Sequence, residues 1–205
     1  MYRINEVFKS VQGEGPAVGT PATFIRFAGC NLHCRYCDTN HQKWREWQLE
    51  ELVSEVKWGP SKVVITGGEP LLTGDRIMPL VRALAATGKS VDLETNGTVA
   101  PPGDLPPYVE NFVISPKLSN SGNDSHDVVL VPDLPAGPLK FVVDSVADLE
   151  EVEQFSRELP HHEIIIMPMG TDPRGMIRKM QVLRAPVKSY GWRLQPRLHV
   201  LMGLR

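Results

Sequence analysis

The chain has 205 residues, 41% of them hydrophobic, and a formal net charge of −2 at pH 7. This length suits one domain with a substantial core, and we predict a single domain over residues 1–205. The charge balance excludes the basic field typical of nucleic-acid binding proteins, and no apolar run is long enough to cross a bilayer. Residues 1–6 lack the apolar core of a signal peptide. We therefore expect a cytoplasmic protein with reduced cysteines.

Apolar runs alternate with helical patterns along the chain. We predict strands, of which the last is the weakest, at residues 22–28, 62–66, 90–95, 111–115, 139–143, 163–167 and 191–196. Alternation of strands and helices is typical of parallel strands joined by helical crossovers.

Four segments between these strands carry an apolar stripe at helical spacing. The first covers residues 47–58, Gly88 predicts the end of the second, Ser145 is the expected N-cap of the third, and Asp172-Pro173 starts the fourth. Their inward side chains are expected to be Leu49, Leu52, Val53 and Val56; Ile77, Leu80, Val81 and Leu84; Leu149, Val152 and Phe155; and Met176, Met180 and Leu183.

Two connections lack a helical pattern. Residues 97–110 contain four prolines and two glycines, and residues 118–137 form a long Ser-, Asn-, Gly- and Pro-rich loop that serves as a lid or lies disordered. A complete eight-unit barrel usually needs about 250 residues. We therefore predict an incomplete, open α/β barrel, TIM-like, of about six mainly parallel strands with fewer helices. Its active site should lie at the carboxyl ends of the strands.

All three cysteines lie between Cys30 and Cys37, with the spacing C-x3-C-x2-C. Thiolates bind soft metals, and three of them hold a four-iron cluster while leaving one iron open. Three other interpretations compete with a cluster: a disulfide that strands the third cysteine, a Cys3His zinc site completed by His33 or His41, and buried inert cysteines, which would not need this tight spacing. The tight spacing favours the open-sited iron–sulfur cluster over zinc.

Short polar or glycine-rich motifs follow the later strands. They are Gly67-Gly68-Glu69, Thr95-Asn96-Gly97, Ser115-Pro116-Lys117 and Met167-Pro168-Met169-Gly170. Each alone is typical of an ordinary turn, but their recurrence at successive strand ends indicates a ligand site. A glycine pair lets the backbone approach a ligand closely, and the Glu69 carboxylate can accept the ammonium of an amino-acid-like cofactor.

The cysteine loop with Tyr36 before its last cysteine, followed by Gly67-Gly68-Glu69-Pro70, resembles the radical S-adenosylmethionine (SAM) superfamily. Four further segments are informative: Gln12-Gly13-Glu14-Gly15, Phe24-Ile25-Arg26-Phe27-Ala28-Gly29-Cys30-Asn31, Cys37-Asp38-Thr39 and Glu94-Thr95-Asn96-Gly97-Thr98. Together they resemble one family within the superfamily, the 7-carboxy-7-deazaguanine synthases. The turn Met167–Gly170 departs from the Gln-Pro type of many relatives.

The resemblance implies a [4Fe–4S] cluster bound by Cys30, Cys34 and Cys37, with SAM on the fourth iron. It implies Mg²⁺ held by the Thr39 hydroxyl. Its cofactor contacts fall on Tyr36, Cys37, Asp38, Gly67, Gly68, Glu69, Gly97, Ser115, Pro116, Lys117, Met167, Pro168, Met169 and Gly170. Its substrate contacts fall on Val11, Gln12, Gly13, Glu14, Arg26, Thr95 and the carboxyl terminus at Arg205.

The activity implied by the resemblance is a radical ring contraction of 6-carboxy-5,6,7,8-tetrahydropterin to 7-carboxy-7-deazaguanine, with loss of ammonia, as used in the synthesis of queuosine-type deazapurines. The Arg26 fork suits the pterin carboxylate, and Glu14 suits its guanidine-like donor edge. A flavodoxin- or ferredoxin-type electron donor and a second copy of the chain are the expected partners, with no nucleic acid and no membrane.

Two rival functions remain at this point. A glycyl-radical-activating enzyme shares the cysteine loop and Gly-Gly-Glu-Pro, but acts on a protein backbone and needs no pterin pocket. A non-catalytic iron–sulfur electron carrier should have four protein thiolates, and this chain has three cysteines.

Overall fold

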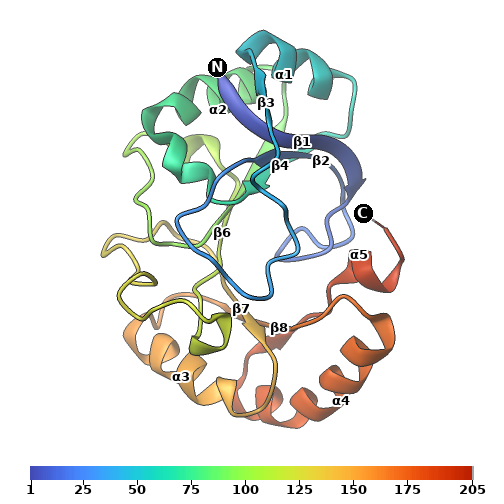
Figure 1. Cartoon of the computed structure of the whole chain (residues 1–205), viewed down its shortest axis with the longest axis vertical. Coiled ribbons are helices and arrows are strands. Elements are labelled where there is room, and N and C mark those ends of the chain that lie inside the picture. Colours follow the sequence, from blue (N-terminus) through green and yellow to red (C-terminus); the bar gives the residue numbers. More distant parts are fainter. Residues whose placement is uncertain (205) are drawn as a thin grey trace.

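The computed structural model describes residues 1–204, and within them the strands form one nine-stranded sheet (Figure 1). The strands are β1 (Tyr2–Val11), β2 (Pro21–Phe27), β3 (Arg45–Trp47), β4 (Lys62–Gly67), β5 (Ser90–Thr95), β6 (Asn111–Ile114), β7 (Leu139–Val143), β8 (Ile164–Pro168) and β9 (Arg193–Leu194). Their order across the sheet is β3-β1-β2-β4-β5-β6-β7-β8-β9.

The predicted strands correspond to β2 and β4 through β9, and these seven pair in parallel. Strands β1 and β3, which add an antiparallel edge, were not predicted. Strand β1 gives a weak signal because only Tyr2 and Ile4 of its residues are buried, and β3 is three residues long. The sheet is therefore mostly parallel and wider than the predicted six strands.

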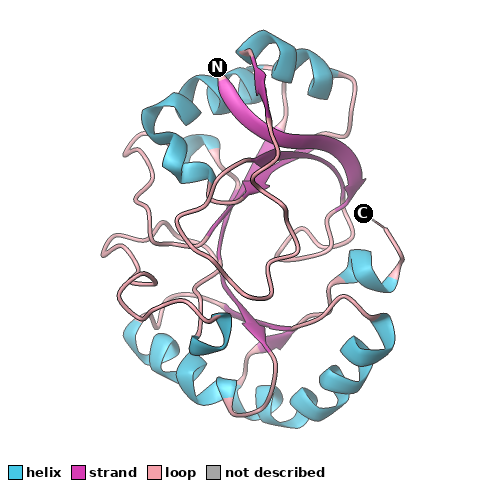
Figure 2. Ribbon diagram, in the orientation of Figure 1, coloured by secondary structure: helices cyan, strands magenta, loops and turns pink. Residues whose placement is uncertain are grey.

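The four predicted helices are present, and Figure 2 shows them in two pairs at opposite ends of the sheet. The helices are α1 (Leu49–Lys57), α2 (Ile77–Ala86), α3 (Asp148–Glu158), α4 (Pro173–Tyr190) and the short α5 (Leu198–Leu201), with 3₁₀ turns η1 (Pro70–Arg76), η2 (Pro106–Tyr108) and η3 (Ser119–Ser121).

Of the three predicted helix-end residues, two are confirmed. Asp172 caps α4 by accepting from the Gly175 backbone N–H at 2.6 Å, and Gly88 follows α2 with a φ of 76°. The prediction of Ser145 as the N-cap of α3 is wrong. Helix α3 begins at Asp148, whose carboxylate reaches back to the backbone N–H groups of Ser145 (3.1 Å) and Asp144 (2.7 Å).

Side-chain alternation decides which residues of the parallel strands face the inside of the curved sheet. Ile25, Ile65 and Leu93 belong to the main core, which also contains the apolar faces of α1 to α4. Phe24 and Val64, one residue away, form a separate small cluster with Ala22 and Phe8. Because the strand period is two, the even-numbered residues further along these strands face the same interior.

The sheet is not closed by strand pairing, and the C-terminal segment bridges its open side. The Gln195 side chain exchanges hydrogen bonds with Gly15, accepting at 2.7 Å and donating at 2.9 Å. The Leu198 backbone N–H donates to the Gly13 carbonyl at 2.9 Å. In Figure 1 the C-terminal segment accordingly ends beside β1 and β2. The α/β sheet is thus mostly parallel and open, consistent with the predicted partial barrel, and a non-strand segment bridges its open side.

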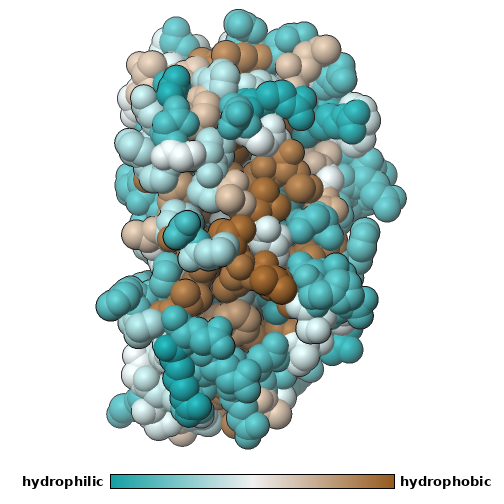
Figure 3. Space-filling view, turned by 90° about the vertical axis from the view of Figure 1, so that its left-hand side faces the viewer, coloured by the Kyte–Doolittle hydropathy of each residue, from teal (hydrophilic) through white to brown (hydrophobic). Residues whose placement is uncertain are grey.

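The predicted helix-free connections are also observed. Within the described chain, residues 97–110 contain only η2, and residues 118–137 contain only η3. Val99, Val109 and Leu134 from these connections pack against the core while staying partly exposed. Figure 3 shows apolar side chains gathered in the middle of the face on which the two connections lie. None of the described helices combines the length and the apolar run that a membrane crossing requires.

Candidate active site

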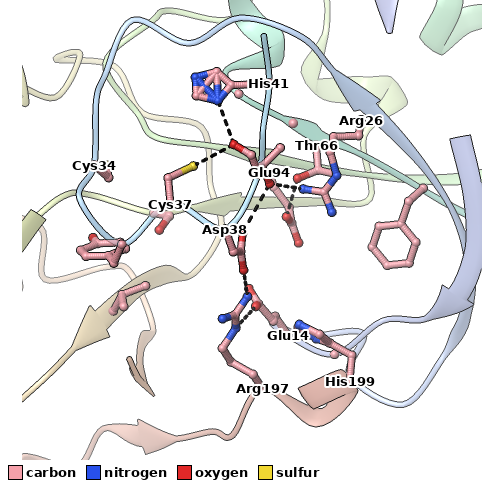
Figure 4. A pocket seen from close by; sticks show the side chains of 18 of the residues that line it. Glu14, Arg26, Cys34, Cys37, Asp38, His41, Thr66, Glu94, Arg197 and His199 are labelled. Carbon is pink, nitrogen blue, oxygen red and sulfur yellow. Dashed lines mark hydrogen bonds and ion pairs between the residues drawn. The ribbon is translucent and has the colours of Figure 1, made fainter. Parts of the chain in front are cut away.

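A pocket of about 1250 Å³ opens at the carboxyl ends of the parallel strands, as the sequence predicts (Figure 4). The predicted site residues that line it are Val11, Gln12, Gly13, Glu14, Arg26, Cys30, Cys34, Tyr36, Cys37, Asp38, Thr39, Gly67, Gly68, Thr95, Ser115, Lys117, Met167, Met169 and Gly170. Four others, Glu69, Gly97, Pro116 and Pro168, lie outside its lining. Arg205 lies outside the described residues.

The three thiols lie on a loop that crosses the mouth of the pocket. All three are free, which removes the disulfide alternative. Cys34 Sγ accepts from the Asn123 side chain at 3.1 Å, so loop 118–137 contacts the cysteine loop.

A zinc ion bound at about 2.3 Å holds its thiolates within about 4 Å of one another. The only described group of three or more His, Cys, Asp or Glu side chains whose ligand atoms all lie within 4.8 Å is Asp124, His126 and Asp127. Cys30, Cys34 and Cys37 do not meet this limit together, which favours a cluster over zinc.

The glycine pair at the end of β4 packs against backbone. Gly67 has a φ of 139°, and a Cβ on it would lie 2.2 Å from the Phe27 carbonyl oxygen. A Cβ on Gly68 would lie 1.8 Å from the Gly29 carbonyl oxygen. The pair therefore joins the end of β4 to the start of the cysteine loop, and both glycines also line the pocket. Any other residue would separate these two loops.

Glu69 lies beneath the pocket floor, with 1% of its surface exposed. Its carboxylate accepts from the Leu71 backbone N–H (3.0 Å), the Thr95 hydroxyl (3.0 Å) and the Asn96 backbone N–H (2.7 Å). These bonds tie the end of β4 to the end of β5. These three donors already surround the Glu69 carboxylate. Direct contact between Glu69 and a cofactor ammonium therefore stays a prediction.

Lys117 presents a half-buried ammonium beside the thiols. Its Nζ donates to the carbonyl and the hydroxyl of Ser115, each at 2.8 Å. Among the described residues, no carboxylate forms an ion pair with it, and burial lowers the pKa of Lys117. A partly buried cation that no carboxylate contacts favours an anionic ligand group.

Arg26 faces the pocket from β2. Its Nε donates to Glu6 Oε1 at 2.9 Å, and its Nη1 donates to the Thr39 hydroxyl at 2.8 Å. The guanidinium also lies 5.6 Å from the centre of the Phe8 ring. Arg26 therefore both pairs with the Glu6 carboxylate and lines the pocket.

Lys140 and Arg197, which surround Glu14, were not predicted as site residues. Lys140 on β7 forms an ion pair with Glu14, and Arg197 Nε donates to Glu14 at 3.1 Å. Arg197 also pairs with Asp38 and donates from Nη1 to the Gly170 carbonyl at 3.2 Å. Burial would raise the pKa of Glu14, but the two cations outweigh it and lower the pKa to about 2. Arg197 thus links the N-terminal turn, the cysteine loop and the loop after β8.

Glu94 and His199 also line the pocket and were not predicted. Glu94 accepts from the Gln12 amide (3.1 Å) and from the Thr66 hydroxyl (2.8 Å). A Cβ on Gly13 would lie 2.0 Å from His199 Nδ1, so Gly13 admits the histidine ring. The period of two along β5 predicts that Glu94 shares the interior face with Asp92, and this signal could have identified it. His33 is exposed, as expected.

Known proteins share this sequence pattern. Residues 24–115 match the model of the radical SAM superfamily. The 7-carboxy-7-deazaguanine synthase of Pyrobaculum aerophilum is 37% identical over 97% of this chain and 93% of its own length. That of Methanospirillum hungatei is 40% identical over 98% and 86%.

Two solved structures resemble this fold. The crystal structure of QueE from Escherichia coli superposes with a TM-score of 0.74 and 27% identity, over 97% of this chain and 94% of that one. Streptococcus suis SuiB bound to S-adenosylmethionine shares the fold alone, with a TM-score of 0.52 and 16% identity over 82% of this chain and 44% of that one. The cysteine loop, the pocket and the full-length similarity lead to one conclusion: the chain belongs to the 7-carboxy-7-deazaguanine synthase family of radical SAM enzymes.

Proposed function

We propose that this protein is a 7-carboxy-7-deazaguanine synthase, a lyase that contracts the ring of 6-carboxy-5,6,7,8-tetrahydropterin with loss of ammonia. One observation carries the proposal: a single pocket joins three free thiols to Arg26 and the N-terminal turn 11–14. Its volume of about 1250 Å³ exceeds the roughly 300–1,000 Å³ typical of a site for one small molecule. Cofactor and substrate can therefore share it.

The cofactor side suits a [4Fe–4S] cluster and SAM. Cys30, Cys34 and Cys37 would hold three irons of the cluster and leave the fourth iron for SAM. When bound, the cluster and SAM would together supply the radical that removes a hydrogen from the substrate. We propose that Lys117 binds the SAM carboxylate. The remaining pocket residues assigned to the cofactor are Tyr36, Asp38, Gly67, Gly68, Ser115, Met167, Met169 and Gly170.

Four residues assigned to the cofactor act from outside the pocket lining. Glu69 orients Thr95 and Asn96 through its hydrogen bonds. The Gly97 backbone N–H donates to the Thr95 hydroxyl at 3.1 Å, so it helps to hold the same strand end. Pro116 and Pro168 lie beside Lys117 and Met169 and shape their loops. We propose that these residues position the cofactor contacts.

The substrate side consists of Arg26, Thr95 and the turn from Val11 to Glu14. Arg26 offers N–H groups in a fork that matches the pterin carboxylate. The turn brings Gln12 and Glu14 to the opposite wall, where Lys140 and Arg197 hold Glu14 ionised. These residues bind and orient the pterin, while the C-terminal segment over Gly13 excludes water from it.

We also propose a Mg²⁺ site at the Thr39 hydroxyl. The Thr39 hydroxyl lines the pocket, accepts from Arg26 and donates toward Asp38 Oδ1 at 3.4 Å. A hydroxyl and water are hard oxygen ligands of the kind that Mg²⁺ prefers, and the ion keeps several of its waters. An ion here would lie between the cysteine loop and the substrate carboxylate on Arg26.

The wider context forms part of the same proposal. The single domain over residues 1–205 receives electrons from a flavodoxin- or ferredoxin-type donor. Three free thiols suit the reducing cytoplasm. A homodimer fits the apolar area in Figure 3, because exposed apolar patches of this kind commonly meet a partner. Sedimentation of the reconstituted protein would measure the oligomeric state.

Anaerobic incubation of the reconstituted protein with the pterin, SAM, Mg²⁺ and a reductant tests the activity. Mass analysis should detect 7-carboxy-7-deazaguanine and ammonia in stoichiometric amounts, and omission of SAM should abolish both. A protein that cleaves SAM while leaving the pterin unchanged would contradict the proposed substrate. Formation of a glycyl radical in an added polypeptide would instead support the glycyl-radical-activating alternative.

A further inference from the structure

The carboxylates that line the pocket differ in their partners. Glu6 pairs with Arg26, Glu14 pairs with two cations, and Asp38 pairs with Arg197. Glu94 is the exception: across residues 1–204, no lysine, arginine or histidine nitrogen lies within ion-pair distance of it. It is therefore the pocket carboxylate best placed to receive a donor group from a ligand.

Neutral donors hold Glu94 without saturating it. The Gln12 amide donates to Oε1 at 3.1 Å, and the Thr66 hydroxyl donates to Oε2 at 2.8 Å. A carboxylate has about four acceptor positions, so each oxygen keeps capacity for another donor. The same Gln12 side chain accepts from the Glu14 backbone N–H at 3.1 Å, which ties Glu94 to the N-terminal turn.

Strand register places Glu94 level with Arg26 on the inner face. Arg26 on β2 pairs with Thr66 on β4, and Thr66 reaches Glu94 on β5 through the hydrogen bond described above. With β4 between them, the two backbones lie about 10 Å apart. A cation and a carboxylate that no basic side chain contacts, at this separation, match a bicyclic molecule with an acid at one end and N–H donors at the other.

We propose that Glu94 accepts the guanidine-like edge of the pterin, through its 2-amino group and the neighbouring ring N–H, while Arg26 holds the carboxylate at the other end. This inference rests on the proposed function. Glu14 then has a different role, because its ion pairs with Lys140 and Arg197 hold the turn that supports Gln12 and, through it, Glu94. Glu94 thus determines which pterin ring edge is accepted.

Glu94→Gln tests the inference, because the amide keeps the shape of the side chain and places an N–H₂ against the donor edge. We expect the Kd for the pterin, measured by pterin fluorescence with the SAM-loaded, unreduced enzyme, to rise on the order of ten- to a hundredfold. For the pterin analogue without the 2-amino group, the variant and the wild type should differ by much less. Cluster absorption and uncoupled SAM cleavage should stay at wild-type levels.

Glu14→Gln is the matched comparison, since it changes a carboxylate across the same pocket. It should weaken the pterin and the analogue by the same factor. Unchanged pterin binding in Glu94→Gln, equal weakening of both compounds, or amine-selective weakening in Glu14→Gln would each overturn the assignment. Glu94→Asp, which withdraws the carboxylate by one methylene, provides the same comparison if the amide variant does not fold.

The outcome is separable from that of the proposed function. If wild-type enzyme fails to convert the pterin, the proposed function fails. If it converts the pterin while Glu94→Gln binds both compounds as the wild type does, only the role of Glu94 is refuted.

Discussion

One network of charged side chains lies at the amino ends of the parallel strands and another at their carboxyl ends. The two networks differ in how many of their charges contact an opposite charge. At the amino ends, Lys62 Nζ contacts Asp92 and Glu110, each at 2.9 Å, and Asn111 donates to Asp92 at 2.8 Å. Burial lowers the pKa of Lys62, but these hydrogen bonds outweigh it and raise the pKa above its usual value. Every charge of this network contacts an opposite charge within the protein, with Lys62 shared by the two carboxylates.

At the carboxyl ends, pairing is incomplete. Glu14, Lys140, Arg197 and Asp38 neutralise one another, whereas Lys117 and Glu94 have no opposite charge in contact among the described residues. Both groups are half-buried, and removing part of the water around a charge without a contacting partner costs stability, so they favour occupation by a ligand. The comparison predicts that changes at the amino ends alter folding alone, whereas changes at the carboxyl ends alter binding and turnover.

Cys34→Ala should give the largest effect at the carboxyl ends. Two thiolates cannot retain a cluster with an open iron, so iron, sulfide and turnover should all be lost. Thermal unfolding of the metal-free variant should match that of metal-free wild type. Full iron content with activity would contradict the cluster assignment, and bound zinc after anaerobic purification would revive the Cys3His alternative.

Lys62→Met should give the largest effect at the amino ends. It leaves Asp92, which is 1% exposed, without its cation, and we expect a loss of about 3–5 kcal/mol in the free energy of unfolding. Urea denaturation measures this loss, while kcat/KM of the remaining folded enzyme should not change. The double variant Lys62→Met/Asp92→Leu should recover much of the stability. A change in substrate KM would contradict the separation of the two ends.

Glu14 should make stability depend on acid pH. Its folded pKa of about 2 lies below the usual 4.5, so the ion pairs stabilise the fold fully above pH 4.5 and lose this contribution as the pH falls toward 2. The shift corresponds to on the order of 3 kcal/mol. Urea denaturation at several pH values should show this decline in the wild type. Glu14→Gln should be less stable at pH 6 and should lack that part of the decline.

Arg26→Lys should separate substrate binding from cofactor chemistry. Lysine keeps the charge but cannot reproduce the two parallel hydrogen bonds of the guanidinium, so kcat/KM for the pterin should fall roughly ten- to a hundredfold. Arg26→Ala should be similarly impaired, and uncoupled SAM cleavage should survive in both variants. Wild-type turnover in Arg26→Lys would mean that Arg26 only neutralises Glu6.

Thr39→Ala should have the smallest effect. It removes one hard oxygen from the proposed Mg²⁺ site and leaves the thiols in place, so we expect a normal cluster spectrum and a few-fold smaller stimulation by Mg²⁺. Titration of turnover with Mg²⁺ measures the response. An unchanged Mg²⁺ response would assign the hydroxyl to Arg26 alone.

Much of the molecule follows from local sequence. The spacing from Cys30 to Cys37 predicts the cluster loop, because three thiolates in eight residues fit few other sites. Apolar runs predict the strands of the parallel sheet, and helical spacing predicts α1 to α4, because both periodicities report which side of an element is buried. The family motifs fall at strand ends, and a parallel sheet brings such ends to one edge.

The tertiary structure alone decided which distant groups meet. Glu14 is separated by 126 residues from Lys140 and by 183 from Arg197, so no local pattern relates them. The motif around Glu69 predicts an acid that binds a ligand. In the fold, β4 lies next to β5, so the carboxylate instead accepts from the backbone N–H groups of Leu71 and Asn96. Strand order and register decide these contacts, since a shift of one residue would turn each side chain to the opposite face.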